Sequence, residues 1–214
     1  MSKRIVVLVS GGGTNLQSLL DAQARGTFGD SRIAGVIASR DDAYALVRAE
    51  NHGVPHLTLR RGDYPDVHAY SLALLDAIRD FGADLVVLAG FLTIVDETLC
   101  RAYPNRIINI HPSLIPSFCG PGFYGLRVHE AALAKGVKVS GATVHFVTEE
   151  CDGGPIILQK AVCVQPDDTP ETLQKRIMKE AEQVLLPEAV RLFCEDRLAV
   201  ENGVTRILSQ EGSL

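Results

Sequence analysis

The chain has 214 residues, enough for one well-packed domain or for one domain with a small appendage. Its hydrophobic fraction is 46% and its charged fraction 22%, as in an ordinary globular protein. The net charge is −5 and no basic cluster exceeds two residues, which argues against nucleic acid as the main partner. No apolar run approaches the roughly 20 residues of a membrane span. The chain enters a strand without a signal-peptide pattern, and its five cysteines are scattered without a CxxC pair, so we expect free thiols in the cytoplasm.

The first half of the chain alternates apolar strands with amphipathic helices. Strands are predicted over 5–9, 32–39, 54–59 and 84–89, the last being the most apolar, and helices over 43–51, 67–81 and 96–102. In the helix over 67–81 we place Leu72, Leu75 and Ile78 on the inner face. This order predicts an open, Rossmann-like parallel sheet with right-handed crossovers and the strand 84–89 at its centre.

A glycine-rich turn, Ser10–Asn15, follows the first strand and precedes a helix. Gly11, Gly12 and Gly13 let the backbone turn sharply and approach a ligand, and the helix start beyond them offers free amides and the positive end of the helix dipole. The turn matches neither the Walker loop nor GxGxxG. Two interpretations stay open, a phosphate site and a plain packing turn.

The segment Arg106–Pro116 delivers an amide and an imidazole to the end of a strand. Its three isoleucines favour a buried strand, and Pro112 ends the strand because it lacks an amide hydrogen. Strand side chains alternate between faces, so Asn109 and His111 point the same way. Ligands of open α/β sheets bind at the carboxyl ends of the strands, and we therefore favour a functional site here over a pair of satisfied polar residues.

Two further strands are predicted over 139–147 and 155–164, and the loop between them carries Asp152 in front of two glycines. Before them, the glycine- and aromatic-rich segment 117–126 has the composition of a mobile cover over the site. These segments bring a candidate acid and a candidate lid into the second half of the chain.

Two helices complete the pattern. The helix over 126–135 carries His129, which we interpret as a satisfied histidine because no HExxH spacing points to a metal. Thr169 caps a long helix with Pro170 in its first turn. Its predicted buried stripe consists of Leu173, Ile177, Ala181, Val184 and Leu185. Glu182 lies off this stripe, at a position typical of a solvated side chain.

Asn109, His111 and Asp152 are the polar residues whose setting points to catalysis. Asn109 and a protonated His111 can donate hydrogen bonds to a developing oxyanion. Asp152 can orient the imidazole, raise its pKa through its charge, and accept or relay a proton. GxSxG is absent and no cysteine has a nucleophile setting, so direct acyl transfer between two bound substrates fits better than a covalent intermediate.

The chain resembles the folate-dependent formyltransferase family, and within it the phosphoribosylglycinamide formyltransferases (glycinamide ribonucleotide transformylases). The resemblance is carried, in this order and over nearly the whole chain, by Ser10–Asn15, Ala89-Gly-Phe91, Asn109-Ile-His-Pro-Ser-Leu-Ile-Pro116, Thr143-Val-His-Phe-Val147 and Asp152-Gly-Gly-Pro155. It implies the formyltransferase fold, with an antiparallel C-terminal portion, in a single domain over 1–214. Residues 1–103 would form a phosphate-binding half and residues 104–214 a catalytic and folate-binding half.

The resemblance also implies the reaction, a transfer of formyl from 10-formyltetrahydrofolate to the amine of glycinamide ribonucleotide in purine biosynthesis, by a cytoplasmic monomer or homodimer without a metal. Asn109 and His111 would polarise the formyl oxygen while Asp152 handles the proton. The ribonucleotide would be bound by Gly11, Gly12, Gly13, Thr14, Asn15 and Glu182. The folate would be bound by Leu92, Thr93, Ile94, Val95, Val147 and Asp152.

The chain departs from the family pattern at Val67, Thr93 and Ser117, where relatives often carry basic residues, and the loop over 118–126 is longer than in the common form. The folate-tail contacts are therefore left open, with Arg60 or Arg61 as possible substitutes.

Formyltetrahydrofolate hydrolase is the alternative function, since it shares the Asn, His and Asp but carries an N-terminal regulatory domain. Methionyl-tRNA formyltransferase carries a C-terminal RNA-binding domain, for which we expect no residues here. A nicotinamide dehydrogenase is disfavoured, because the glycine turn fails GxGxxG and the second strand ends in Ala38-Ser39-Arg40 without a ribose-binding acid. A non-catalytic nucleotide-binding module would bind its ligand without turnover.

Overall fold

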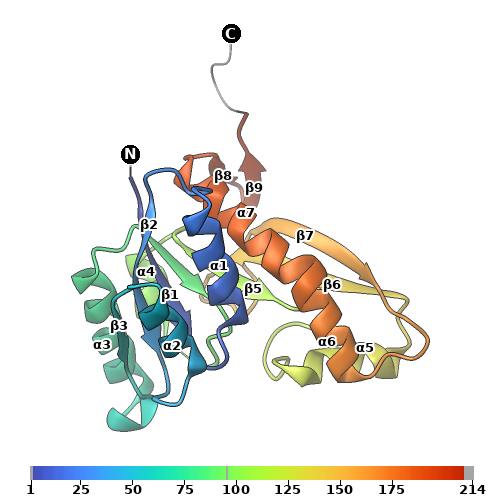
Figure 1. Ribbon diagram of the computed structural model, residues 1–214. Coiled ribbons are helices and arrows are strands. Elements are labelled where there is room, and N and C mark those ends of the chain that lie inside the picture. The colour runs from blue at the N-terminus through green and yellow to red at the C-terminus, as the bar shows by residue number, and fades with distance from the viewer. Residues whose placement is uncertain (1, 95, 210–214) are drawn as a thin grey trace.

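A seven-stranded sheet forms the centre of the computed structural model, which describes residues 2–94 and 96–209 (Figure 1). The strand order is β3-β2-β1-β4-β5-β6-β7, with β4 in the middle as predicted. The strands are β1 (Arg4–Val9), β2 (Arg32–Ala38), β3 (His56–Thr58), β4 (Leu85–Leu88), β5 (Ile107–His111), β6 (Val139–Phe146) and β7 (Ile156–Cys163). The first five pair in parallel, whereas β6 and β7 pair antiparallel, which confirms the predicted fold class.

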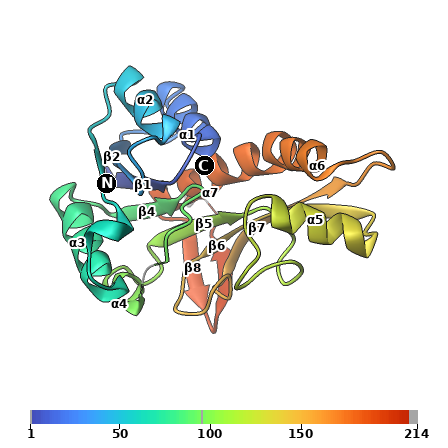
Figure 2. The ribbon, with the colours of Figure 1, turned by 90° about the horizontal axis from the view of Figure 1, so that it is seen from below.

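Helices cover both faces of this sheet (Figures 1 and 2). One face is covered by α1 (Thr14–Ala24), α2 (Tyr44–Asn51), α6 (Pro170–Ile177) and α7 (Gln183–Cys194), and the other by α3 (Val67–Asp80) and α4 (Glu97–Ala102). The strand β1 serves both layers, because Ile5 and Val7 belong to one core and Val6 and Leu8 to the other. Side chains that alternate between two apolar layers explain why this strand is apolar throughout.

The remaining elements lie at the edges of the sheet. The helix α5 (Leu126–Lys135) lies beside α6, the turn η1 (Arg61–Asp63) follows β3, and η2 (Met178–Glu182) joins α6 to α7. A separate hairpin is formed by β8 (Leu198–Glu201) and β9 (Val204–Ile207), which our sequence analysis did not include. Asn202 and Gly203 connect these strands with φ angles of 51° and 77°, the positive values that a tight type I′ hairpin turn requires.

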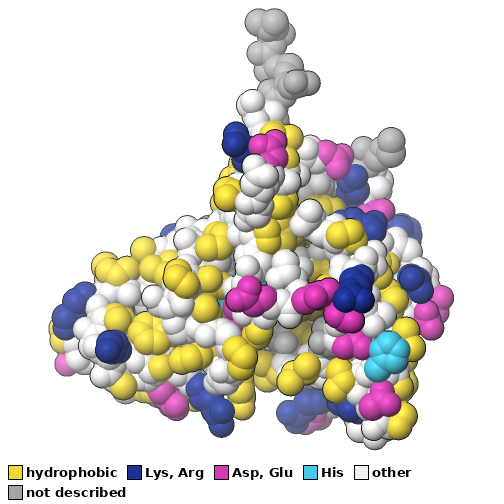
Figure 3. All heavy atoms as spheres, turned by 180° about the vertical axis from the view of Figure 1, so that it is seen from behind, with side chains coloured by type: hydrophobic (Ala, Val, Ile, Leu, Met, Phe, Trp, Pro, Cys, Tyr) yellow, Lys and Arg dark blue, Asp and Glu magenta, His cyan; other side chains and the backbone are white. Residues whose placement is uncertain are grey.

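The surface of the molecule differs between its two halves. Seen from behind, charged side chains gather over the half that holds α3 and α4, while hydrophobic side chains are more frequent over β6 and β7 (Figure 3). Among the described residues, no helix is long and apolar enough to span a bilayer.

One predicted helix face is wrong in part. In α3 the buried stripe is formed by Tyr70, Ser71, Leu74, Leu75 and Ile78, whereas Leu72 is exposed. At 3.6 residues per turn, Leu72 lies about 100° around the helix from Ser71, which places it off the stripe. The sequence did not indicate this helix face, because the polar Ser71 belongs to the buried stripe.

Candidate active site

The antiparallel pairing of β5 with β6 places two polar side chains side by side. Asn109 lies directly opposite His145 in the register, and its amide Nδ2 donates to His145 Nε2 at 3.1 Å. The other ring nitrogen of His145, Nδ1, lies 2.9 Å from the Phe146 carbonyl oxygen and donates to it. Because the amide nitrogen of Asn109 can only donate, Nε2 is the acceptor, and His145 orients the amide of Asn109.

Asp152 connects the two histidines of this site. Its carboxylate lies 3.5 Å from His111 Nδ1 and 3.6 Å from His145 Nε2, and it accepts a hydrogen bond of 2.8 Å from the Gly120 amide. His111 donates its second nitrogen, Nε2, to the Phe118 carbonyl at 2.9 Å. The structure therefore brings Asp152 against His111, a contact that sequence spacing could not show.

Burial and hydrogen bonding shift the pKa of both groups downward. Burial lowers the pKa of His111, and this effect outweighs the Phe118 carbonyl and the Asp152 charge, which raise it. Our expectation of a protonated His111 is thus corrected, because the ring is desolvated. Burial alone would raise the pKa of Asp152, but the contact with His145, the hydrogen bond from the Gly120 amide and the proximity of His111 hold it below its ordinary value.

The loop that carries Asp152 is shaped by close contacts of its glycines. Asp152 adopts a positive φ of 55°, and its side chain is largely buried. A Cβ atom on Gly154 would lie 1.8 Å from the Phe146 carbonyl oxygen, so only glycine fits there. The carboxylate is thereby turned into the site, as predicted, while Glu149 stays exposed and pairs with Arg101.

The glycine turn after β1 meets a buried carboxylate from the far end of the chain. Asn15 donates its amide Nδ2 to Glu182 Oε2 at 2.7 Å, and Glu182 is only 5% exposed. Burial raises the pKa of Glu182, with the hydrogen bond from Asn15 acting against it. The Oδ1 atom of Asn15 is buried without a partner in the described part of the chain.

The solvated position that the helix periodicity indicated for Glu182 is wrong, and so is the buried position of Val184, which is 50% exposed. The cause is η2, a π-helical turn over Met178–Glu182. A π turn contains one more residue than an α turn and therefore rotates every side chain that follows it. The rotation carries Glu182 inward to Asn15 and turns Val184 outward.

The loop after β4 exposes large apolar side chains next to the glycine turn. Leu92 is 62% and Ile94 77% exposed, while the Leu92 amide is fixed by a 2.9 Å hydrogen bond to Ser10 Oγ. Val95 lies outside the described residues. Val147, which follows β6, donates its amide to the Ile107 carbonyl at 2.9 Å.

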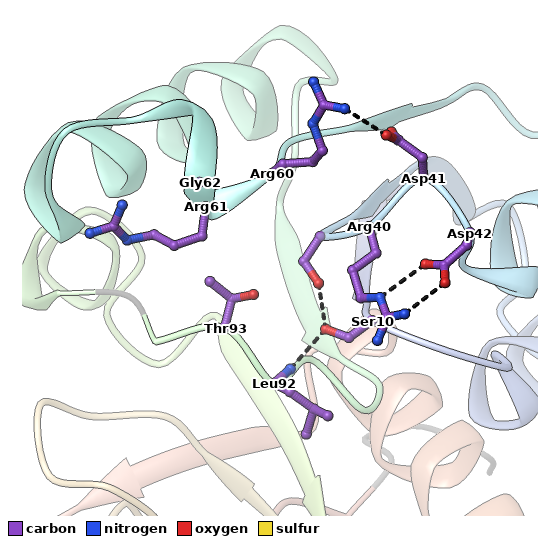
Figure 4. A pocket seen from close by; sticks show the side chains of 10 residues that line it. Ser10, Arg40, Asp41, Asp42, Arg60, Arg61, Gly62, Leu92 and Thr93 are labelled. Atoms are coloured by element: carbon purple, nitrogen blue, oxygen red, sulfur yellow. Dashed lines mark hydrogen bonds and ion pairs between the residues drawn. The ribbon is translucent and has the colours of Figure 1, made fainter.

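A pocket of about 600 Å³ opens next to this loop, at the carboxyl ends of β1, β2 and β3 (Figure 4). Leu92 and Thr93 line it together with three arginines. Arg40 pairs with Asp42 at 2.6 Å, and Arg60 pairs with Asp41 and with Asp63, each at 2.8 Å. Arg61 instead donates to the Tyr64 carbonyl at 2.9 Å and has no carboxylate partner among the described residues.

His129 differs from our interpretation of it as a satisfied histidine. It is 0% exposed, and neither ring nitrogen has a hydrogen-bond partner within residues 2–94 and 96–209. Burial lowers the pKa of His129 to about 4, with a smaller contribution from His111. The sequence offered no sign of this, because the burial of the ring depends on the elements packed around α5.

The glycine turn after β1 and the polar side chains of β5 share one edge of the sheet. Leu8 of β1 pairs with Leu88 of β4, and Leu88 pairs with Asn109 of β5. Neighbouring strands are about 4.8 Å apart, so Leu8, two residues before the glycine turn, and Asn109 are two strand spacings, about 10 Å, from each other. The sheet reverses its winding direction between β1 and β4, the place where open α/β sheets bind ligands. Within the described residues, no group of three or more His, Cys, Asp or Glu side chains could hold a metal ion.

Comparison with known proteins identifies the family of this chain. The sequence profile of the formyl transferase family matches residues 3–190. The chain belongs to the formyl transferase family. This formyl transferase is 48% identical to glycinamide ribonucleotide transformylase 1 from Symbiobacterium toebii, whose crystal structure superposes with a TM-score of 0.91 and with coverage of 97% of this chain and 95% of that one. The predictions of the family, of its fold and of a transferase are confirmed.

Two further similarities concern the candidate activities. Phosphoribosylglycinamide formyltransferase of Escherichia coli (strain K12) is 37% identical over 198 residues, which are 91% of this chain and 88% of that protein. A formyltetrahydrofolate deformylase from Pseudomonas syringae pv. tomato str. DC3000 has a TM-score of 0.86 and 32% identity, and the match covers 98% of this chain but 67% of that one. The formyl transferase fold thus serves both transfer and deformylation in its relatives.

Proposed function

We propose that this formyl transferase moves a formyl group from 10-formyltetrahydrofolate to the amine of glycinamide ribonucleotide, a step of de novo purine biosynthesis. The observation that carries the proposal is the shared edge of the sheet, where Asn109, beside His111 and Asp152, lies two strand spacings, about 10 Å, across from β1, the strand that leads into the glycine turn. A substrate with a phosphate at one end and an amine at the other fits this separation. The similarity to proteins named for this reaction agrees with it.

In the chemical step, the amine attacks the formyl carbon and the carbonyl oxygen becomes an oxyanion. The Asn109 amide, held by His145, donates a hydrogen bond to that oxygen. His111 donates a second one from Nδ1 once that nitrogen holds a proton, because Nε2 is already bonded to the Phe118 carbonyl. The tetrahedral intermediate then collapses, the bond from carbon to the folate nitrogen breaks, and the formylated amine leaves. No covalent enzyme intermediate is required.

Asp152 accepts and then returns the proton that this step transfers. The attacking amine must lose one proton, and the departing folate nitrogen must gain one, so a single group can serve both if it accepts and then returns a proton. The depressed pKa of Asp152 keeps it ionised and ready to accept, and its contact with His111 gives the proton a second position. The reaction then ends with the site in its starting protonation state.

The acceptor would bind through residues 11–15 and Glu182. The turn offers backbone amides and the start of α1 to the phosphate. The buried Glu182 has a single hydrogen-bond partner among the described residues, Asn15, and its other oxygen is left for the ribose hydroxyls. A deformylase has no need of an acceptor, so an acceptor site built from these residues favours transfer.

The donor would place its pterin against the exposed Leu92 and Ile94 and the half-buried Val147, since apolar side chains of this size suit a flat heterocycle. Thr93 and Val95 complete this segment. The glutamate tail of the folate carries carboxylates, and Arg61 is the arginine of the adjoining pocket without a carboxylate partner among the described residues. We assign Arg61 to the tail, in place of the basic residues absent at Val67 and Thr93.

One assay tests the proposal against deformylation. Purified enzyme is given 10-formyltetrahydrofolate with and without glycinamide ribonucleotide, and formylated acceptor and free formate are both measured. We expect formyl transfer that depends on the acceptor, with little formate. Release of formate at the same rate in both samples would identify a hydrolase, and binding of both ligands without either product would identify a non-catalytic module.

A further inference from the structure

The helix α2 braces the glycine turn from one side through its Ala45 and Arg48 residues. The Ala45 amide, left free in the first turn of α2, donates to the Gly11 carbonyl at 3.1 Å. One helical turn further on, Arg48 Nε donates to the Gly12 carbonyl at 2.8 Å. Two successive carbonyls of the turn are thus held toward the same helix.

These bonds decide where the amides of the turn point. In a trans peptide the C=O and the following N–H point in opposite directions. With the Gly11 and Gly12 carbonyls held toward α2, the Gly12 and Gly13 amides are directed away from it. In the described part of the chain neither amide donates to a protein acceptor, so both are free for an anion.

Arg48 also strengthens the second of these donors. Its guanidinium is charged, and a charged donor on the Gly12 carbonyl polarises the whole peptide, which makes the Gly13 N–H a better donor. The side chain is itself fixed, since Nη1 donates to Gln17 Oε1 at 2.9 Å and the guanidinium carbon lies 5.1 Å from the centre of the Tyr44 ring. The brace is therefore rigid.

Close packing removes the remaining freedom of the turn. Gly13 has a φ of 70°, and a Cβ atom there would lie 2.7 Å from Ala45 Cβ. The turn thus lies directly against α2. Asn15, two residues further on, holds Glu182 and keeps a buried Oδ1 that has no partner within the described part of the chain. A polar atom buried without a partner requires explanation, and a bound ligand would supply one.

We propose that Arg48 is a positioning residue for the phosphate of the acceptor: it orients and polarises the amides of the glycine turn without contacting the reacting atoms. This inference rests on the function proposed above and names a determinant of specificity for phosphorylated over unphosphorylated acceptors. It assigns a role to α2, an element outside the site residues predicted from the sequence.

The test compares two acceptors that differ only in the phosphate, glycinamide ribonucleotide and glycinamide riboside. Arg48→Met keeps the length of the side chain but removes the donor and the charge. We expect kcat/KM for the ribonucleotide to fall roughly 10- to 100-fold, the range for a lost hydrogen bond to a charged group, through KM with kcat nearly unchanged. The value for the riboside should stay as in the wild type.

Two further variants control this experiment. Arg48→Gln places an amide nitrogen at the position of Nε and should recover part of the loss, because it restores the bond without the charge. Arg25→Met, at the far end of α1, changes the net charge equally and should leave both acceptors unaffected. Equal losses for both acceptors, or unchanged use of the ribonucleotide by Arg48→Met and Arg48→Gln, would overturn the inference. A wild-type enzyme that transfers no formyl to the ribonucleotide would instead overturn the proposed function.

Discussion

Replacing His129 should make the protein more resistant to acid. The ring is fully buried in α5 with no hydrogen-bond partner among the described residues, and its pKa is lowered to about 4 from the ordinary value of 6.5. The folded state therefore binds fewer protons at this position than the unfolded state. Stability that is present above pH 6.5 is lost as the pH falls toward 4.

The size of the effect follows from the two pKa values. A difference of about 2.5 corresponds to about 3.4 kcal/mol below pH 4, at about 1.36 kcal/mol per pKa unit, and to about 2 kcal/mol at pH 5. His129→Leu, which has a similar volume, removes this penalty. It also removes two unpartnered polar atoms, so we expect the variant to be no less stable than the wild type at pH 7.5.

Urea unfolding at pH 7.5 and pH 5.0 measures the prediction. Between these values the wild type should lose about 2 kcal/mol more of its unfolding free energy than His129→Leu does. His56→Leu is the matched control, because it removes a histidine that the fold leaves exposed. Equal losses for the wild type and His129→Leu would refute the account of a neutral, unpartnered ring.

Three further predictions concern the proposed reaction. Asp152→Asn should lower turnover by about 10² or more with little change in KM. In an NMR titration it should also make His111 harder to protonate, because a charge that raises the pKa of His111 is lost. Near-normal turnover would show that Asp152 takes no part in the proton transfer. Asn109→Ala and His111→Ala should each cost about 10² to 10³ in turnover, and the double variant less than the product, whereas strict additivity would assign them to separate steps. Arg61→Ala should raise KM roughly 2- to 5-fold for a donor that carries the glutamate tail, which is the range expected for an exposed ion pair. The KM for a donor without the tail should not change. An equal effect on both donors would place the tail elsewhere.

The parts of this site that local sequence could predict are those that depend on local backbone geometry. Alternation along a strand put Asn109 and His111 on one face, and a proline ended the strand beside them. Three glycines before a helix marked the turn at the edge of the sheet. Such features follow from the residues alone because period, chirality and proline chemistry act over a few neighbouring positions.

What only the tertiary structure decided depends on register and on helix rotation. His145 reaches Asn109 because β5 and β6 pair antiparallel with those residues opposite each other, and no pattern within either strand specifies that register. Glu182 reaches Asn15 because one π-helical turn rotates the end of a helix that reads as continuous in the sequence. His129 is buried, with no hydrogen-bond partner among the residues that the structure describes, for the same kind of reason. Desolvation is a property of every element packed around a side chain, and the sequence near that side chain does not record it.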